Sequence, residues 1–358
     1  MSISISQRTH ASCASSFRKK LAAAVLAAAS IVCVSGEARA DDPPPFIPWT
    51  SLLPSFTWGY EPSSSNICVS GHPSCVDSVI AEMEDREAPL DASCNHNEIF
   101  ALTYLRVTEH YQVAATTPGF FSDPNFINHQ DAVFAQYYFD AWDNWRAGNL
   151  GDVPRAWQIA FSAADNKKVT GLGNLLLGMS AHVNRDLPYT LATIGLVKPD
   201  GTSRKPDHDK VNEFLNTAFG PVFEELAARF DPKIDDLQIE GTTLDEFVMM
   251  QVLMLWREIA WRNAELLVNA PTPELRAIVE ANIERVATIE ADLIYIATAY
   301  RNVNLTAVLG ELTMLLADPF SVAQAQVDRT VNLFRGVLGP LLGSGGAAQR
   351  DQFCATHG

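Results

Sequence analysis

The chain has 358 residues, of which 26 are Lys or Arg and 42 are Asp or Glu, so its formal net charge is −16. Hydrophobic residues make up 47% of the chain, which is enough for a folded core and excludes global disorder. The acidic balance argues against nucleic acid and against anionic membrane surfaces as partners, because both would be repelled.

The first 40 residues are typical of a secretion signal. A basic segment precedes the apolar, alanine-rich stretch Leu21–Val34, and Ala38-Arg39-Ala40 fits the small-x-small pattern of signal peptidase sites. We expect cleavage after Ala40, and a secreted or periplasmic protein without stable membrane anchoring. Cleavage would remove five basic residues and one acidic residue, which leaves 21 basic against 41 acidic residues and a net charge near −20.

Four cysteines follow the signal: Cys68, Cys75, Cys94 and Cys354. An even number in an oxidising compartment predicts two disulfides. Of the three possible pairings we prefer Cys68–Cys75, which closes a small local loop, together with Cys94–Cys354. A zinc site is the weaker alternative, because no pair has the C-x-x-C spacing.

The hydrophobic residues recur with a helical period nearly everywhere from Cys75 onward, and no alternating strand pattern stands out. We predict an all-α fold, a single-domain bundle of about ten helices over residues 75–358. A Pro/Ser-rich arm over residues 41–74 precedes it, with some of its aromatic side chains lying on the globular body. The predicted helices are Cys75–Arg86, Cys94–Ala115, Asn125–Ala147, Val153–Ala164, Thr170–Asp186, Asp207–Phe230, Leu244–Asn269, Pro273–Ala299 and two pieces within Leu305–Leu342.

The most informative stretch is the end of the helix Thr170–Asp186. Its apolar stripe continues with His182 and then Asp186, four residues later on the same face. Burying such groups unpaired costs about 1–3 kcal/mol, so they indicate a site. His182, Asp186 and the neighbouring Asn184 are candidate catalytic residues: the pair could bind a cation, or the aspartate could orient the imidazole. The alternative is a core histidine bonded to its own helix neighbour.

A second cluster, Asp207-His208-Asp209, begins the next predicted helix. Pro188 should end the helix of His182, and Val197–Pro206 should form a polar surface loop. If that loop is a short hairpin, the cluster returns near His182. One divalent metal, with zinc favoured, would then be bound by His182, Asp186 and one or more of Asp207, His208 and Asp209. The alternative is helix capping by one of the aspartates.

Three further candidates lie on other helices. Asp131 begins the buried face of its helix and could be a cap or a site residue, while Tyr138 on the same face could donate into a site or belong to the core. Arg257 falls among apolar residues of its helix. A half-buried arginine needs a carboxylate, for which Asp131, Asp140 and Asp186 are possible partners, or it binds the anion of a substrate.

The string Gly178–Pro188, with the pattern G-M-x-A-H-x-N-x-D-L-P, resembles a family of uncharacterised bacterial helical proteins known as a domain of unknown function. The segments Phe121–Phe126 and Asp207–Asn212 share the resemblance, which covers roughly Ala92 to Trp261. It implies an all-helical fold and a site around His182, Asn184 and Asp186. It implies no activity.

A weaker likeness is to the secreted zinc-dependent phospholipase C and the related single-strand nucleases. Their helical H-x-x-x-D ligand pair is matched by His182 and Asp186. The second histidine that follows shortly after the aspartate in that family is absent, and the mature chain should begin with Asp41 instead of a tryptophan. The likeness therefore implies a single metal at most.

The sequence favours a secreted, metal-assisted hydrolase of esters or phosphoesters, in which the metal would lower the pKa of a bound water. The alternative is a non-catalytic secreted protein that binds a hydrophobic small molecule or lipid, with Arg257 and His182 fixing its polar head. A third interpretation makes these polar residues purely architectural. The motifs G-x-S-x-G, H-E-x-x-H and the P-loop are absent from the sequence.

Overall fold

The computed structural model describes residues 45–299, apart from residues 58, 60–61, 232–233 and 235–243, together with residue 355. In this part of the chain every regular element is a helix, which confirms the all-α prediction. The elements are η1 (Trp49–Leu52), α2 (Ser74–Ala92), α3 (Glu98–Thr116), α4 (Pro124–Ala147), η2 (Leu150–Asp152), α5 (Arg155–Asp165), α6 (Gly171–Ser180), η3 (Ala181–Asp186), α7 (Leu187–Ile194), α8 (Lys205–Arg229), α9 (Leu244–Val268) and α10 (Pro273–Thr298).

Several predictions fall on residues outside this part. The signal segment, Cys354 and the helical pieces within Leu305–Leu342 lie there, so the predicted total of about ten helices stays a prediction. None of the described helices is long and apolar enough to cross a membrane.

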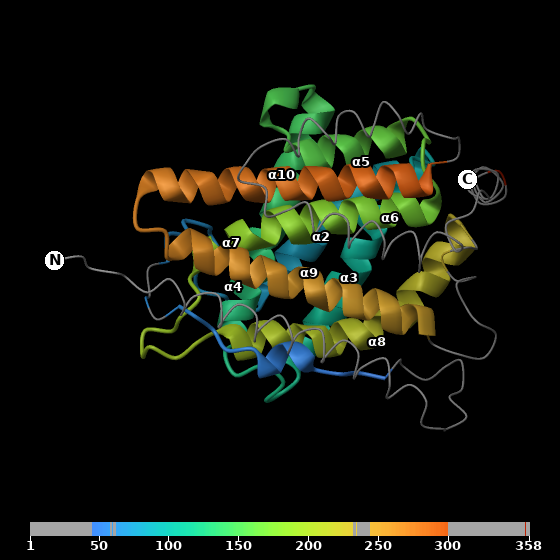
Figure 1. Ribbon diagram of the computed structural model, residues 1–358. Coiled ribbons are helices and arrows are strands. Elements are labelled where there is room, and N and C mark those ends of the chain that lie inside the picture. Colours follow the sequence, from blue (N-terminus) through green and yellow to red (C-terminus); the bar gives the residue numbers. More distant parts are fainter. Residues whose placement is uncertain are drawn as a thin grey trace.

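The continuous run α6–η3–α7 forms the centre of the bundle (Figure 1). All ten residues of α6 are buried, as expected for a helix that is apolar all round. Helices α3, α5 and α10 pack against α6, while α4, α9 and α10 pack against η3. Gly178 lets α3 approach closely, because a Cβ at this position would collide with the ring of Phe100. The predicted site residues His182 and Asp186 therefore lie in the middle of the molecule.

The prediction that Pro188 ends the helix of His182 is wrong. The backbone changes from the α-helix α6 to a wider π-helix at η3 and continues as α7 through Pro188. Pro188 lies in the first turn of α7, where a missing backbone N–H is tolerated. The eight residues of α7 carry the chain about 12 Å further before it leaves the helix.

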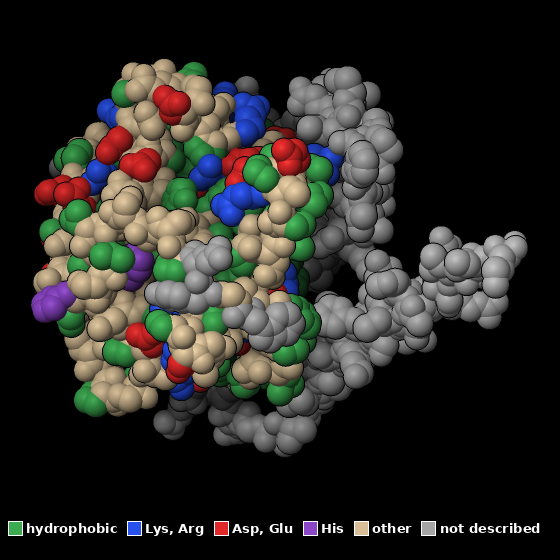
Figure 2. Space-filling view, turned by 90° about the vertical axis from the view of Figure 1, so that its left-hand side faces the viewer, with side chains coloured by type: hydrophobic (Ala, Val, Ile, Leu, Met, Phe, Trp, Pro, Cys, Tyr) green, Lys and Arg blue, Asp and Glu red, His purple; other side chains and the backbone are tan. Residues whose placement is uncertain are grey.

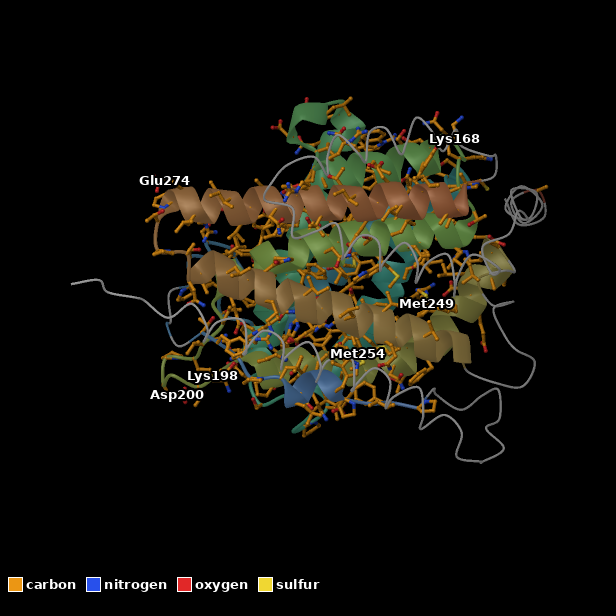
Figure 3. All side chains as sticks on the ribbon, viewed as in Figure 1. Lys168, Lys198, Asp200, Met249, Met254 and Glu274 are labelled. Carbon is orange, nitrogen blue, oxygen red and sulfur yellow. A yellow bond between two sulfur atoms is a disulfide. The ribbon has the colours of Figure 1, made fainter. Side chains whose placement is uncertain are left out.

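The loop after α7 is a short hairpin, which is the condition on which the predicted metal site depended. An isolated bridge pairs Val197 with Ser203, and the Lys198 N–H donates to the Thr202 carbonyl at 2.8 Å. Lys198 and Asp200 lie at the outer edge of the molecule in Figure 3. The hairpin leads the chain to the start of α8. His182 precedes α7 and the hairpin follows it, so α7 lies between the two along the chain.

The part of the N-terminal segment around η1 lies along α8 and α9. Trp49 Nε1 donates to Gln251 Oε1 of α9 at 2.9 Å, and Lys205 Nζ of α8 donates to the Thr50 carbonyl at 3.0 Å. Phe46 and Trp49 pack against the core, which confirms that aromatic side chains of this segment lie on the globular body.

The predicted disulfide Cys68–Cys75 is present and joins the turn before α2 to the first turn of that helix. Cys94 is disulfide-bonded as well, and its predicted partner Cys354 lies outside the described residues. On the face shown in Figure 2, acidic and basic side chains are interspersed. The acidic excess of the sequence is therefore not gathered into one patch on that face.

Candidate functional site

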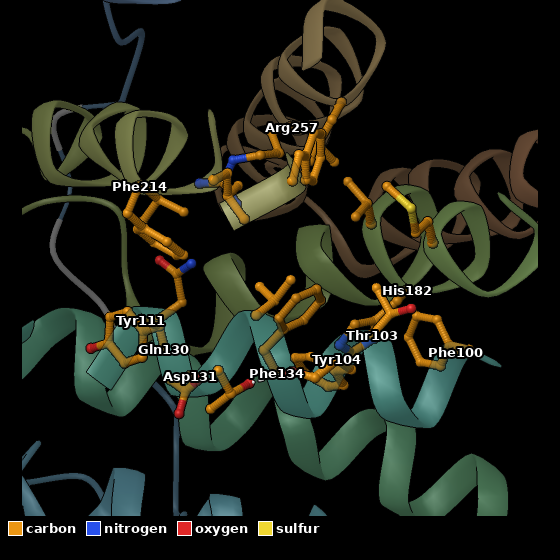
Figure 4. Close-up of a pocket in the computed structure, with 18 of the residues that line it drawn as sticks. Phe100, Thr103, Tyr104, Tyr111, Gln130, Asp131, Phe134, His182, Phe214 and Arg257 are labelled. Carbon is orange, nitrogen blue, oxygen red and sulfur yellow. Dashed lines mark hydrogen bonds between the residues drawn. The ribbon is translucent and has the colours of Figure 1, made fainter. Parts of the chain in front are cut away.

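A cavity of about 120 Å³ lies between α3, α4, α8, α9 and the junction of α6 with η3 (Figure 4). Most of its walls are apolar, with contributions from Phe100, Phe134, Val211, Phe214, Phe223 and Leu253. Eight residues with polar or ionisable side chains also line it: Thr103, Tyr104, Thr108, Tyr111, Gln130, Asp131, His182 and Arg257. All but Thr108 are labelled in Figure 4. Three of the predicted site residues, Asp131, His182 and Arg257, therefore meet at one cavity.

His182 is held rigidly and presents one free nitrogen. Its Nδ1 bonds to Asp186 Oδ2 at 2.9 Å, and its ring stacks on Phe134 with centroids 3.5 Å apart. Asp186 also accepts hydrogen bonds from Trp157 Nε1 and Arg185 Nη1, each at 2.9 Å. Because Asp186 is the acceptor in all three bonds, the imidazole hydrogen is on Nδ1.

The opposite nitrogen, His182 Nε2, is buried and has no partner among the described residues. In this tautomer Nε2 carries no hydrogen, so it can only accept a hydrogen bond, and His182 lies at the cavity wall. Burial lowers the pKa of His182, and the bond to Asp186 opposes that shift only in part. The ring is therefore neutral and available to a hydrogen-bond donor.

Asp131 is a half-buried residue whose carboxyl oxygen Oδ2 is fully buried, and no counter-charge contacts it among the described residues. Its Oδ2 has no hydrogen-bond partner, and burial raises its pKa from the ordinary 3.8 to about 7. Tyr104 lies close enough for the Asp131 charge to act on it: burial and then this charge raise the pKa of Tyr104 well above its usual value. The Tyr104 hydroxyl is also buried without a partner, whereas Tyr111 donates to Asn128 Oδ1 at 2.5 Å.

Four unpartnered polar atoms therefore face one apolar cavity: His182 Nε2, Tyr104 Oη, Asp131 Oδ2 and Gln130 Oε1. Each buried polar group without a partner costs about 1–3 kcal/mol, so folded proteins contain few of them. The described part of the chain contains sixteen such atoms, and these four belong to residues of a single cavity. Tyr104 and Gln130 were not predicted, although Tyr104 lies one helical turn after Phe100 on the inner face of α3.

Arg257 lies across the cavity from Asp131 in the view of Figure 4. Its Nε donates to Asn212 Oδ1 at 2.8 Å and its Nη2 to the His208 carbonyl at 2.7 Å. The prediction that a carboxylate pairs with it is wrong, since its hydrogen-bond acceptors are neutral groups of α8. Burial without a contacting anion lowers the pKa of Arg257 to about 10.

Asp207 is a structural residue rather than a neighbour of His182. Its carboxylate accepts hydrogen bonds from the Ser122 backbone N–H at 2.7 Å, the Ser122 hydroxyl at 2.6 Å and the Asp123 N–H at 2.8 Å. It thereby fixes the loop before α4, where Asp123 is the N-cap. The alternative interpretation, helix capping, is close to this role. The backbone amides that Asp207 binds, however, lie at the start of α4 and not at the start of its own helix α8.

Asp209 and His208 also have structural partners. Asp209 Oδ2 forms a buried ion pair with Lys205 Nζ at 2.8 Å, while His208 Nε2 lies 3.3 Å from the Arg257 carbonyl. No group of three or more His, Cys, Asp or Glu side chains in the described part of the chain could bind a metal. The predicted metal site is not assembled there, because the side chains of Asp207, Asp209 and His208 have these other partners.

Two other candidates do not line the cavity. Asn184 donates to Glu290 Oε2 of α10 at 2.6 Å and to Ser180 Oγ at 3.2 Å, and burial raises the pKa of Glu290 to about 8. Tyr138 belongs to the core, where its ring lies 5.1 Å from Phe100 and 5.4 Å from Trp157 between centroids. Of the predicted catalytic trio, only His182 reaches the cavity.

A family model matches residues 76–296, which is more than half of the chain and includes every residue that lines the cavity. The chain belongs to the family of unknown function DUF5995. The expected membership of an uncharacterised family is thereby confirmed, over a longer segment than Ala92 to Trp261. No curated protein and no solved structure matches the chain. The likeness to phospholipase C and single-strand nucleases thus has no support beyond the spacing of His182 and Asp186.

Proposed function

We propose that this DUF5995 protein binds a small, largely apolar molecule with a hydrogen-bonding group. The observation that supports this proposal is the coincidence of apolar walls with four buried, unpartnered polar atoms at one cavity. Apolar walls with a few convergent polar groups are the usual composition of small-molecule sites. A bound molecule would satisfy groups that the fold alone leaves unpaired.

The volume favours a compact ligand over a whole lipid. A water molecule takes about 30 Å³ of liquid, and an apolar cavity of about 150 Å³ takes up benzene. The 120 Å³ of this cavity therefore suits a molecule of about that size. The aromatic rings of Phe100, Phe134 and Phe214 would contact its apolar body.

Toluene and benzyl alcohol, measured by calorimetric titration and thermal unfolding, test the proposal. Both should bind and raise Tm, and benzyl alcohol should bind more tightly because its hydroxyl can donate to His182 Nε2. Val107→Phe should abolish binding, since Val107 lines the cavity from α3. Val113→Phe is the matched control, because Val113 is exposed on the same helix. If neither compound binds the wild-type protein at millimolar concentration, the proposal is wrong.

A second candidate is the hydrolase that the sequence favoured, and the orientation of His182 supports it. An imidazole whose Nδ1–H is held by a carboxylate, with Nε2 facing a cavity, has the geometry of a general base. The hydroxyls of Thr103 and Thr108 donate to carbonyls of their own helix, so water would be the nucleophile.

Hydrolysis of short nitrophenyl esters by wild-type protein and His182→Gln tests this candidate. The variant should lose most of the activity, because an amide cannot accept the proton. Equal rates in the two proteins would remove His182 as a base. Loss of activity on treatment with a chelator would require a metal bound partly by residues outside the described ones.

Secretion is also proposed, and the Cys68–Cys75 disulfide supports it, because structural disulfides form in oxidising compartments. The exported protein should begin at Asp41. N-terminal sequencing of protein from the culture medium or periplasm tests this, and an intact Met1 in a cytosolic fraction would contradict it.

A further inference from the structure

The proposed function leaves the chemistry of the ligand open. We infer that the ligand carries a protonated amine, which pairs with the carboxylate of Asp131 and donates toward His182. This inference rests on the proposed function and narrows its ligand class.

The first argument is the hydrogen-bonding character of the cavity. His182 Nε2 accepts only, because its partner nitrogen carries the hydrogen that contacts Asp186. The carboxylate of Asp131 and the amide oxygen of Gln130 are acceptors too, and the Tyr104 hydroxyl can act in either sense. A complementary ligand must therefore supply donors, and an ammonium group supplies three.

The second argument is the missing counter-charge. The titratable groups that face the cavity with Asp131 are Tyr104 and Tyr111 from α3, His182 from η3 and Arg257 from α9, while the α8 wall is apolar. None of them lowers the pKa of Asp131, which burial alone raises to about 7. A cation bound beside this carboxyl would bring the pKa back down and keep the group ionised.

Arg257 does not occupy that position. Its Nε and Nη2 are bonded to Asn212 and His208 of α8, on the opposite side of the cavity from Asp131 in Figure 4. The cavity thus has a cationic end at Arg257 and an acceptor-rich end at Asp131. An ammonium group would bind at the acceptor end, away from the guanidinium.

The third argument is the aromatic wall at the acceptor end. Phe134 stacks on His182, and the ring of Tyr104 lies with its centroid 4.6 Å from that of His182. Phe100 packs edge-on against the same imidazole at 5.8 Å. The face of Phe134 toward His182 is covered by the imidazole, so these rings fix the orientation of His182 and surround the acceptor end with apolar groups.

Four probes of similar size separate the head groups: benzylamine, benzyl alcohol, toluene and benzoate. Calorimetric titration at about pH 8, where Asp131 is ionised, should show benzylamine binding about tenfold or more tightly than benzyl alcohol, with benzoate weakest. Asp131→Asn should remove the preference for the amine and leave the affinity for benzyl alcohol nearly unchanged. Asp140→Asn, an exposed position on the same helix, should behave like the wild type.

The affinity for benzylamine should also fall about tenfold on going from pH 8 to about pH 6, because the proton taken up by Asp131 competes with the amine. Benzyl alcohol should show no such dependence. An amine affinity that is equal in wild type and Asp131→Asn overturns the inference, as does a preference for benzoate. Binding of toluene and benzyl alcohol without preference for the amine overturns the inference but supports the proposed function. Failure of all four probes refutes both.

Discussion

Replacing Asp131 by Asn should change how the stability of the empty protein depends on pH. The carboxyl has a pKa of about 7 in the folded chain against 3.8 ordinarily, because it is buried without a counter-charge. Between these values the unfolded chain has released the proton while the folded chain retains it. The free energy of unfolding therefore falls by about 1.4 kcal/mol for each pH unit across this window.

The whole loss amounts to about 4 kcal/mol, from about three units of pKa shift, and is complete above about pH 7. Asparagine has the same shape but does not titrate. Asp131→Asn should therefore match the wild type below about pH 4 and exceed its stability by up to about 4 kcal/mol at pH 8.

Equilibrium urea unfolding at intervals between about pH 4 and pH 8 measures this difference directly. Asp140→Asn removes an exposed carboxylate from the same helix and should track the wild type throughout. A stability difference between Asp131→Asn and wild type that does not change with pH would refute the assignment of Asp131 as an uncompensated buried carboxyl.

Three other substitutions test the surroundings of the cavity. Asp186→Asn should lower the free energy of unfolding by about 3 kcal/mol, since it weakens two buried hydrogen bonds and one half-buried one; a urea midpoint equal to wild type would contradict this. Gly178→Ala should cost about 1–3 kcal/mol by collision with Phe100, and calorimetry showing no loss in Tm would exclude that close approach. Replacing Cys68 and Cys75 together by Ser should cost about 2.5 kcal/mol, because it frees a short loop; an unchanged urea midpoint would count against this.

The helices and the central pair were predictable because their signals are local. The helical period located most of the helices to within a few residues, and the spacing of His182 and Asp186 on one helix face predicted their contact. The apolar stripe before His182 indicated correctly that the imidazole is buried. The sequence left two interpretations of Asp131, a helix cap and a site residue. A position near a helix start does not determine which side chains pack over it.

The remaining site could not be predicted because it depends on contacts between distant helices. The backbone donors that satisfy Asp207 belong to Ser122 and Asp123, far away in the sequence. The role of Tyr104 as a polar cavity residue follows from its unpartnered hydroxyl, which a sequence pattern does not distinguish from a core ring. The helix end predicted at Pro188 was wrong because a proline can either end a helix or lie in the first turn of the next one.

The π-helix η3 has a consequence for relatives of this chain. A π turn contains one more residue than an α turn, so the side chains before and after Ala181–Asp186 are rotated relative to an uninterrupted α-helix. A relative that lacks one residue in this segment would turn a different side chain toward Trp157 and lose the pairing with His182. The length of this short segment, more than overall similarity, therefore decides which members of the family can keep the imidazole in the orientation seen in this chain.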